Sequence, residues 1–403
     1  MKSSKLLLSV YLPTLLLSLA QGILIPTLPL YAKSLGVTFA LVSLAVGAAG
    51  VGTLLADIPS GVLLERLGRR PSMLAGCGAV ALSCLLVPVL PNFASLVVLQ
   101  FIGGLGSALW AMSRHVFLAD STIPAERGRA ISIFAGLYRM GNFGGPAIGG
   151  IVADRFGLAS PFLVAGVLAA IGMAVSYAFI PESEARTATI STGAYLRGMG
   201  KVVAANAGVL SSAGFAQLCT QMIRAGRQII VPLYAAYAIG LDVSAVGAII
   251  SISSAIDMVL FLPAGIVMDR IGRKAAIIPC FLILSIGMAM VPLSHDYVTL
   301  LFATTIMGFG NGIGSGTMMT LGADLAPAGA VGSFLGIWRL IGDAGGAGGP
   351  LVVGGVADLI GLAASAYALA AIGLLSVILF AFTVPETHRR APKVAADTSP
   401  NAG

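Results

Sequence analysis

The stretch GVLLERLGRR, at residues 61–70, returns half a chain later as GIVMDRIGRK, at residues 265–274. Two glycines, an acidic residue, an arginine and a final pair of basic residues recur in register, 204 positions apart. Each copy follows one long apolar run and precedes another, which is typical of a cytoplasmic hairpin between two transmembrane helices. The recurrence therefore predicts a chain built from two copies of one membrane-spanning unit.

The composition indicates that lipid, and not water, surrounds most of this chain. Of its 403 residues 57% are hydrophobic and 10% are charged, and the mean hydropathy is +0.98. A soluble domain carries about 25% charged residues. The apolar runs are long enough for helices that rise about 1.5 Å per residue to cross a hydrocarbon core of about 30 Å. We therefore expect an all-α membrane protein.

The net charge of +7 follows the expected topology and does not indicate a nucleic-acid partner. Of the 23 lysines and arginines, 16 fall in segments expected on the cytoplasmic side, and Lys33 and Arg155 fall on the other side. This asymmetry is the positive-inside rule. The four cysteines stand singly in apolar runs, without the spacing of metal ligands. We expect no nucleic acid, no metal and no cofactor, and membrane lipid as the surrounding partner.

Apolar runs and their interruptions predict twelve transmembrane helices. They cover residues 6–31, 38–63, 71–90, 93–118, 129–153, 159–181, 205–238, 243–267, 275–293, 298–322, 331–357 and 362–384. The first run begins like a secretory signal peptide but continues for a full span, so we interpret it as an uncleaved helix. The expected domains are a six-helix bundle at 1–181, a cytoplasmic linker at 182–204, a second bundle at 205–386 and a disordered tail at 387–403. Both termini are expected in the cytoplasm, because the number of helices is even and the N-terminus is basic.

Further pairs of residues support the repeat. At the same offset of 204 positions, Asp120 corresponds to Asp324, and the dipeptide Gly145-Pro146 corresponds to Gly349-Pro350. Two six-helix halves of parallel topology, joined by a cytoplasmic linker, are the architecture described for major facilitator transporters. The chain resembles this superfamily over its whole length. The resemblance implies its fold of two pseudo-symmetric six-helix bundles, with a substrate site between the halves near the midplane.

The repeated turn resembles the superfamily's signature between helices 2 and 3 and between helices 8 and 9, with Glu65 where an aspartate is usual. The resemblance implies a cytoplasmic gate, in which an acid and adjacent arginines form charge-assisted bonds that open when the halves rock apart. Simple positive-inside anchoring is the alternative. The expected gate residues are Gly61, Glu65, Arg66, Gly68, Arg69, Arg70, Gly265, Asp269, Arg270, Gly272, Arg273, Lys274, Arg114 and Asp120.

A second signature lies in the fifth helix and resembles the motif of the superfamily's antiporters, notably its twelve-helix drug/proton exporters. Small residues four apart let helices pack closely, and a proline loosens the helix, although a merely well-packed helix is the alternative. Two other features of those exporters are missing. Gln100 stands where an arginine of the fourth helix is expected, and the first helix has no acid. The signature residues are Gly141, Gly145, Pro146, Gly149 and Gly150, with a near-copy at Gly349 and Pro350.

Ionisable residues inside the predicted spans are costly, so each is a functional hypothesis. A central cavity with surplus positive charge would attract an anion or an acidic zwitterion. The alternative is that these charges pair internally and hold the halves together. The aromatic residues Tyr138, Tyr234 and Trp338 are expected beside them in the cavity, with core packing as the alternative. The deep charges are Arg139, Arg224, Arg227, Arg339, Asp257 and Asp343, while Asp57 and Arg114 lie nearer the cytoplasmic end.

Three carboxylates are candidates for proton coupling: Asp257, Asp343 and Asp57. A carboxylate in a low-dielectric site favours its protonated form, while a nearby arginine favours the charged form. Arg339 and Asp343 are four residues apart and share one helix face. Asp343 is therefore a candidate to exchange its proton for substrate by competition for Arg339.

The sequence contains none of the motifs HExxH, GxSxG or the phosphate-binding lysine loop, so we do not expect an enzyme. The glycine run from Gly310 to Gly316 lies inside an apolar segment and is interpreted as helix packing. We expect a monomeric secondary active transporter of the cell or inner membrane, which exports small amphipathic compounds, drugs included, in exchange for protons. The alternatives are a proton-coupled symporter that imports a small organic anion and, of another class, an integral-membrane enzyme.

Overall fold

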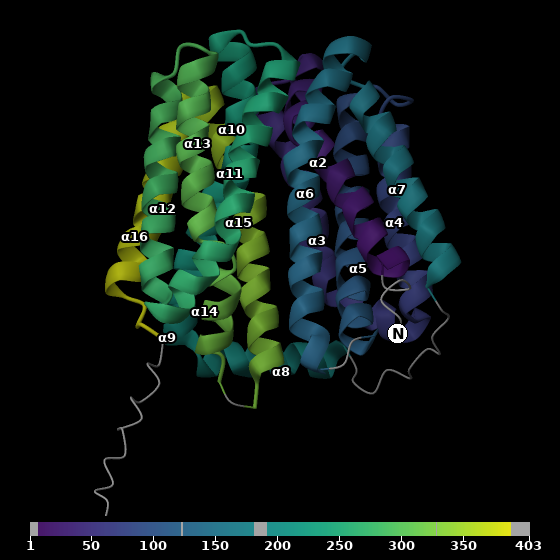
Figure 1. Cartoon of the computed structure of the whole chain (residues 1–403), viewed down its shortest axis with the longest axis vertical. Coiled ribbons are helices and arrows are strands. Elements are labelled where there is room, and N and C mark those ends of the chain that lie inside the picture. Colours follow the sequence, from purple (N-terminus) through teal and green to yellow (C-terminus); the bar gives the residue numbers. More distant parts are fainter. Residues whose placement is uncertain (1–6, 122–123, 181–191, 328, 388–403) are drawn as a thin grey trace, which may run out of the picture.

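The computed structural model describes residues 7–121, 124–180, 192–327 and 329–387, and no strand occurs among them. The predicted tail, apart from Thr387, and the first part of the predicted linker lie outside these ranges. Within them, two helical bundles stand side by side (Figure 1). Nine segments are long and apolar enough to cross a membrane, and a tenth, bent one also qualifies. The more polar helices α4 and α6 complete the twelve that the sequence predicts.

The N-terminal half comprises η1 (Leu7–Tyr11), α2 (Leu12–Ser34), α3 (Phe39–Leu67), α4 (Arg69–Leu86), α5 (Phe93–Ser121), α6 (Pro124–Phe156) and α7 (Ser160–Phe179). The linker helix is α8 (Thr192–Ala205). The C-terminal half comprises α9 (Ala207–Val209), η2 (Leu210–Gly214), α10 (Phe215–Tyr234), η3 (Ala235–Ile239), α11 (Val243–Arg270), α12 (Arg273–Met290), η4 (Val291–Leu293), α13 (Tyr297–Ile313), α14 (Thr317–Leu325), α15 (Val331–Leu359) and α16 (Leu362–Phe382).

Glycines with positive φ explain why the repeated turn keeps its glycine. Gly68 (φ 83°) joins α3 to α4, and Gly272 (φ 140°) joins α11 to α12. Residues with a Cβ rarely adopt these backbone angles, so glycine is required where two long helices reverse direction within one residue. The two copies of the motif therefore occupy equivalent hairpins of the two halves.

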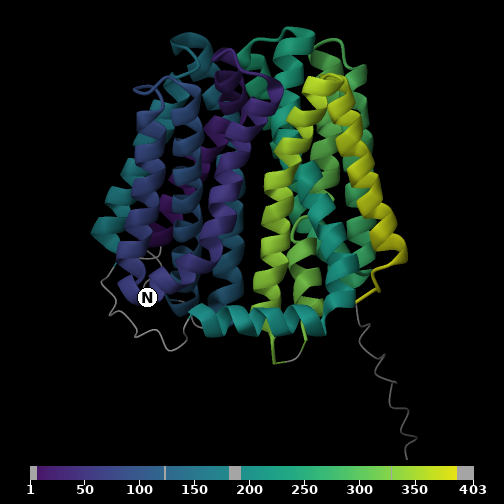
Figure 2. The same ribbon diagram turned by 180° about the vertical axis from the view of Figure 1, so that it is seen from behind.

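The linker contains a helix that the sequence analysis did not predict. Helix α8 is bent by 72° from the segment that continues into α10. It lies across one end of both bundles, near the N-terminus (Figures 1 and 2). We call this the linker end of the molecule and the other the opposite end. The sequence analysis expects the linker end to face the cytoplasm.

The membrane span predicted at 298–322 is present, but its helix is interrupted at residues 314–316. Helix α13 ends at Ile313 and α14 begins at Thr317. The break holds Gly314 and Gly316, the latter with φ 78°. Besides allowing close helix packing, the glycine run interrupts the helix. The interruption leaves backbone carbonyl oxygens free to accept hydrogen bonds from side chains. Non-helical backbone at membrane depth is tolerated where it is buried in protein or lines a cavity.

The two halves meet along two seams, α6 against α11 and α3 against α15. In both views the ribbons of the halves lie close together at the opposite end and diverge toward the linker end (Figures 1 and 2). At the opposite end, Asp358 accepts hydrogen bonds from the backbone N–H groups of Phe39 (2.8 Å) and Ala40 (2.9 Å). A carboxylate at the first turn of α3 is stabilised by the unpaired N–H groups and the helix dipole.

The glycines of the fifth-helix signature make the close contacts of that helix. A Cβ on Gly145 would lie 2.6 Å from the Cα of Gly22 in α2, and one on Gly150 would lie 2.6 Å from the carbonyl oxygen of Val243 in α11. Gly354 occupies the equivalent place on the other seam, where a Cβ would lie 2.6 Å from the carbonyl oxygen of Phe39. Small residues thus let both seams close.

We predict that Gly354→Val opens the α3–α15 seam at the opposite end. Overpacking of this kind costs about 1–3 kcal/mol, which lowers the closed population roughly tenfold or more. Spin labels at Phe156 and Leu359, which are 75% and 84% exposed, report the distance between the halves. Gly355→Val is the matched control, since a Cβ there meets nothing within 4 Å. The same distance distribution in both variants would contradict the prediction.

Candidate substrate cavity

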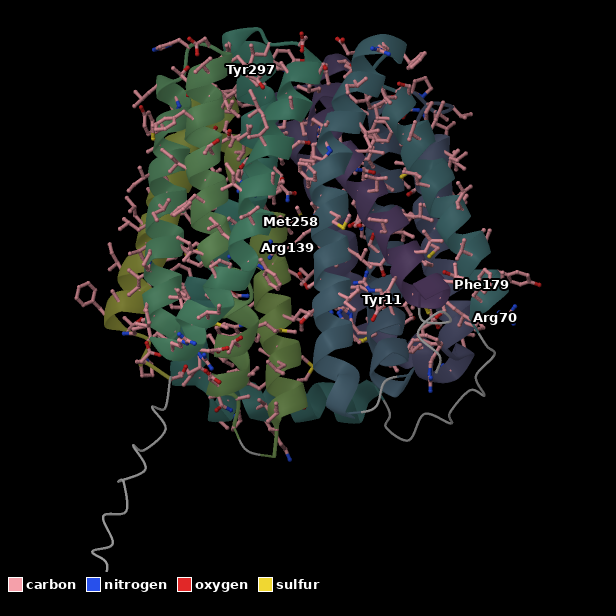
Figure 3. The ribbon with its side chains drawn as sticks, in the orientation of Figure 1. Tyr11, Arg70, Arg139, Phe179, Met258 and Tyr297 are labelled. Carbon is pink, nitrogen blue, oxygen red and sulfur yellow. The ribbon has the colours of Figure 1, made fainter. Side chains whose placement is uncertain are left out.

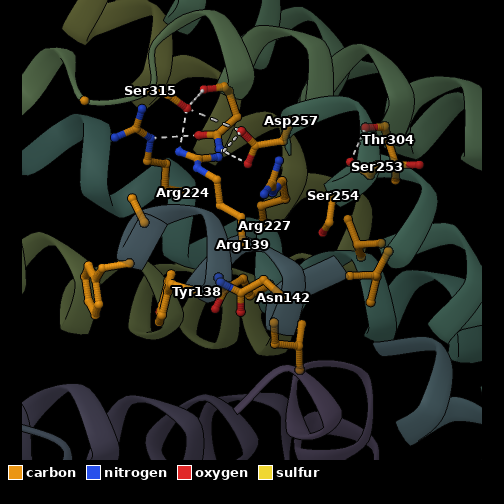
Figure 4. Close-up of a pocket in the computed structure, with 18 of the residues that line it drawn as sticks. Tyr138, Arg139, Asn142, Arg224, Arg227, Ser253, Ser254, Asp257, Thr304 and Ser315 are labelled. Carbon is orange, nitrogen blue, oxygen red and sulfur yellow. Dashed lines mark hydrogen bonds and ion pairs between the residues drawn. The ribbon is translucent and has the colours of Figure 1, made fainter. Parts of the chain in front are cut away.

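A cavity of about 480 Å³ lies between the halves, lined by residues of α2, α5, α6, α10, α11, α13 and the α13–α14 break. Four arginines and one aspartate are its charged lining residues in the described part of the chain: Arg114, Arg139, Arg224, Arg227 and Asp257. Figure 4 shows three of the arginines gathered around Asp257, with Tyr138 and Asn142 across the cavity. The cavity therefore carries surplus positive charge.

Arg139 and Asp257 join the two halves by an ion pair. Nη1 of Arg139 in α6 donates to Oδ1 of Asp257 in α11 at 2.8 Å, and Nη2 donates to Oγ of Ser315 at 2.7 Å. Asn311 donates to the other carboxylate oxygen at 2.7 Å. The two charged side chains are 21% and 15% exposed. Figure 3 places Arg139 between the halves, about midway along the helices.

The break between α13 and α14 holds a second arginine. Arg224 donates from Nε to Oδ1 of Asn311 at 2.9 Å and from Nη2 to the carbonyl oxygen of Gly314 at 3.3 Å. Its guanidinium also lies 4.9 Å from the ring centroid of Phe281. Neutral acceptors satisfy its hydrogen bonds without cancelling its charge, so Arg224 adds a positive charge to the cavity wall.

Arg114 and Arg227 have no carboxylate partner among the described residues. Nε of Arg114 and Nη1 of Arg227 are buried without a hydrogen-bond partner. The Arg114 guanidinium lies over the rings of Trp110 (4.5 Å) and Phe134 (4.1 Å). Buried donors are normally satisfied, so these two side chains are suited to bind an acceptor on a ligand. Arg114, expected in the gate, thus lines the cavity.

A second ion pair crosses the other seam, about one helical turn from the place that the repeat makes equivalent to the first. Arg339 in α15 donates from Nη2 to Oδ1 of Asp57 in α3 at 3.0 Å. Arg139 and Arg339 are 200 positions apart, and so are Asp57 and Asp257. Asp343 also contacts Arg339, at 3.4 Å from Nε. Asp57, a candidate for proton coupling in the sequence analysis, therefore lies in an inter-half pair.

Three basic residues of the predicted gate, Arg70, Arg273 and Lys274, form hydrogen bonds within their own halves. Arg273 binds Asp324 at 2.8 Å and Asp269 at 3.0 Å, while Glu386 accepts from the backbone N–H groups of Arg273 and Lys274. These contacts fasten α11, α12 and α14 together at the linker end. In the other half, Arg70 donates to the carbonyl oxygen of Tyr177. The side chains of Glu65 and Asp120 lie outside the described residues.

Two of the three predicted cavity aromatics lie in the packed core instead. Trp338 is 2% exposed, stacks on Phe334 and donates from Nε1 to the carbonyl oxygen of Met318 at 2.9 Å. Tyr234 is 7% exposed and donates to the carbonyl oxygen of Pro292. Neither residue is among those that line the cavity, so both rings pack in the core where the sequence analysis expected them in the cavity. Tyr138 does line the cavity.

The sequence analysis missed the neutral polar residues of the site. Asn142, Gln228, Asn311 and Ser315 line the cavity, and two of them fix Arg139, Arg224 and Asp257. An amide or hydroxyl inside an apolar run was the available signal, because such groups also need partners in the membrane.

A family profile described as Major Facilitator Superfamily matches residues 10–210 and 213–401. The chain belongs to the major facilitator superfamily. It is therefore a multi-pass membrane transporter, and the predicted fold is confirmed. An uncharacterized MFS-type transporter of Methanocaldococcus jannaschii is 24% identical over 364 residues, which cover 88% of this chain and 92% of that protein.

Two further comparisons are more limited. The quinolone resistance protein NorA of Staphylococcus aureus is 26% identical over 177 residues, which cover 44% of this chain and 45% of that protein. The crystal structure of the human organic anion transporter MFSD10 (TETRAN) superposes with a TM-score of 0.68 at 19% identity, over 94% of this chain and 99% of that chain. Likeness at this level of identity shows a shared fold and does not choose a substrate.

We predict that Asp257→Ala destabilises the protein by about 3 kcal/mol, because it leaves four partly buried arginines facing one cavity without a carboxylate. The matched control is Asp269→Ala, which removes a carboxylate that is 69% exposed and paired with Arg273. A surface pair of this kind contributes about 1 kcal/mol or less. Denaturant unfolding in detergent measures both. Equal losses of unfolding free energy would show that Asp257 is not the counter-charge of the cavity.

Proposed function

We propose that this transporter binds the acidic group of a small amphipathic organic compound in the arginine-lined cavity and exports the compound in exchange for protons. The observation that carries the proposal is the excess of four arginines over one aspartate around the cavity. A low-dielectric cavity lined by one sign of charge concentrates ligands of the other sign. A volume of about 480 Å³ suits a small molecule.

Two likenesses support the direction of export. The chain is similar over 44% of its length to a protein named for quinolone resistance, and its fifth helix carries the antiporter-type signature. The human protein of similar fold is described as an organic anion transporter, which is compatible with a cationic cavity. We further propose that the linker end faces the cytoplasm, that the protein works as a monomer in the cell or inner membrane, and that protons supply the driving force.

The Arg139–Asp257 pair favours a second candidate, proton-coupled uptake of the anion. An anion that takes Arg139 from Asp257 leaves a carboxylate without its counter-charge. Such a carboxylate is costly in a low-dielectric site unless it binds a proton. The anion and the proton then bind together, which is the requirement of a symporter. Exchange needs a site where substrate and proton exclude each other.

We predict that Arg227→Ala and Arg114→Ala each weaken binding of naphthalene-2-sulfonate roughly tenfold to hundredfold, because each removes a charge-assisted donor that has no protein acceptor. Equilibrium binding to protein in nanodiscs measures this loss. Arg155→Ala is the matched control, since Arg155 is exposed at the end of α6 and far from the cavity. Unchanged affinity in both variants would remove the anion-binding proposal.

We predict that an imposed pH gradient drives naphthalene-2-sulfonate across proteoliposomes that contain the protein. A sulfonate stays charged at all working pH values, so a pH dye reports protons carried by the protein alone. Proton movement opposite to sulfonate establishes exchange, and movement in the same direction establishes symport. Transport of a lipophilic cation such as tetraphenylphosphonium, without transport of the sulfonate, would contradict both forms of the proposal.

A further inference from the structure

A second cavity of about 500 Å³ lies beside the first and carries a different charge. It is lined by residues of α2, α3, α4, α5, α6, α10 and α15. Of its described lining residues, Asp343 is the one that is charged. Ile25, Tyr138, Asn142 and Gln228 line both cavities, so the two spaces adjoin along one wall.

Two carboxylates share one arginine beside this second cavity. Arg339 lies between two carboxylates, Asp57 at 3.0 Å and Asp343 at 3.4 Å. The side chain of Asp57 is 9% exposed, and it forms the shorter bond. The side chain of Asp343 is 30% exposed and lines the cavity. Asp343 is the more exposed of the two carboxylates that share Arg339, and it is the one that lines the cavity.

Gln100 gives an independent indication of a ligand. It lines the second cavity, is 7% exposed, and its side chain has no hydrogen-bond partner in the described part of the chain. Buried side-chain amides are normally bonded, and one that faces a cavity is placed to bind what enters it. The amide oxygen accepts hydrogen bonds, as does the carboxylate of Asp343. Both acceptors suit a cationic donor.

We propose that the second cavity binds the ammonium group of a zwitterionic substrate, with Asp343 as its counter-charge and Gln100 as a further acceptor. The acidic group of the same molecule lies among the arginines of the first cavity, so this inference rests on the proposed function. The apolar body of the molecule lies along the shared wall, beside Ile25 and Tyr138. The substrate class is therefore an amphipathic compound with an acid at one end and an amine at the other.

In this arrangement the substrate and the proton exclude each other at Asp343, which is the condition for exchange. An ammonium group bound at Asp343 and a proton bound at Asp343 use the same carboxylate. Substrate therefore binds when the proton has left, and the proton binds when the substrate has left. A purely anionic compound does not meet this condition, because displacement of Asp257 from Arg139 favours joint binding with a proton.

Two matched probes test the inference: naphthalene-2-sulfonate, and the same compound with a 2-aminoethyl group at ring position 6. Their dissociation constants are measured in nanodiscs for the unmodified chain, for Asp343→Asn and for Asp154→Asn. The unmodified chain should bind the amino probe about tenfold more tightly or better, because the amine gains a charge-assisted bond. Asp343→Asn should bring the ratio to about one. Asp154→Asn, which changes an exposed carboxylate at the opposite end, should keep the ratio.

The remaining outcomes distinguish failure of this inference from failure of the anion-binding proposal. Equal binding of both probes by the unmodified chain, or an amine preference that survives in Asp343→Asn, overturns this inference and leaves the anion-binding proposal standing. Failure of both probes to bind overturns the two together. Gln100→Leu provides a second variant if Asp343→Asn does not fold, and an amine preference that it leaves unreduced also overturns the inference.

Discussion

Two ion pairs join the halves of this molecule, Arg139–Asp257 at 2.8 Å and Arg339–Asp57 at 3.0 Å, and they limit how the halves can separate. Each pair crosses one seam, and each is mostly shielded from water. A charge that loses its partner in such surroundings costs several kcal/mol. The halves can therefore separate at this depth only if a ligand, a proton or water takes the place of the lost partner. That requirement couples binding to the motion of the halves.

The internal repeat explains the geometry of the two pairs. Both arginines and both aspartates are related by 200 positions, whereas the motif turns and the Gly-Pro dipeptides are related by 204. The second pair therefore lies about one helical turn nearer the linker end. The two seams differ in the charged residues that lie next to each ion pair. Arg224 and Arg227 lie beside the first pair (Figure 4), while a second carboxylate, Asp343, accompanies the other. The internal repeat places one ion pair at each seam, and the residues that depart from the repeat give the two pairs different charged neighbours.

The sequence was sufficient for the architecture, because membrane-length runs and a repeated turn constrain a helical membrane protein strongly. It was also sufficient to find the deep charges, which are costly enough to stand out. It did not reveal their partners, because pairing between α6 and α11 depends on how the halves face each other. The position of Asp57 in an inter-half pair was not predicted, although Asp57 and Asp257 stand at the same offset of 200 positions as Arg139 and Arg339. The core packing of Trp338 and Tyr234 could not be predicted, because their hydrogen-bond partners, the carbonyl oxygens of Met318 and Pro292, lie in other elements of the fold.

A structure of the protein in complex with naphthalene-2-sulfonate tests the central claim most directly, because it locates the acidic group relative to the arginines. The account predicts the sulfonate in the first cavity, with its oxygen atoms in hydrogen-bonding contact with Arg227 and with at least one of Arg114, Arg139 and Arg224. A sulfonate bound outside this cavity, or in it without contact to any arginine, would contradict the account. The surplus positive charge would then serve the packing of the halves and not the recognition of a substrate.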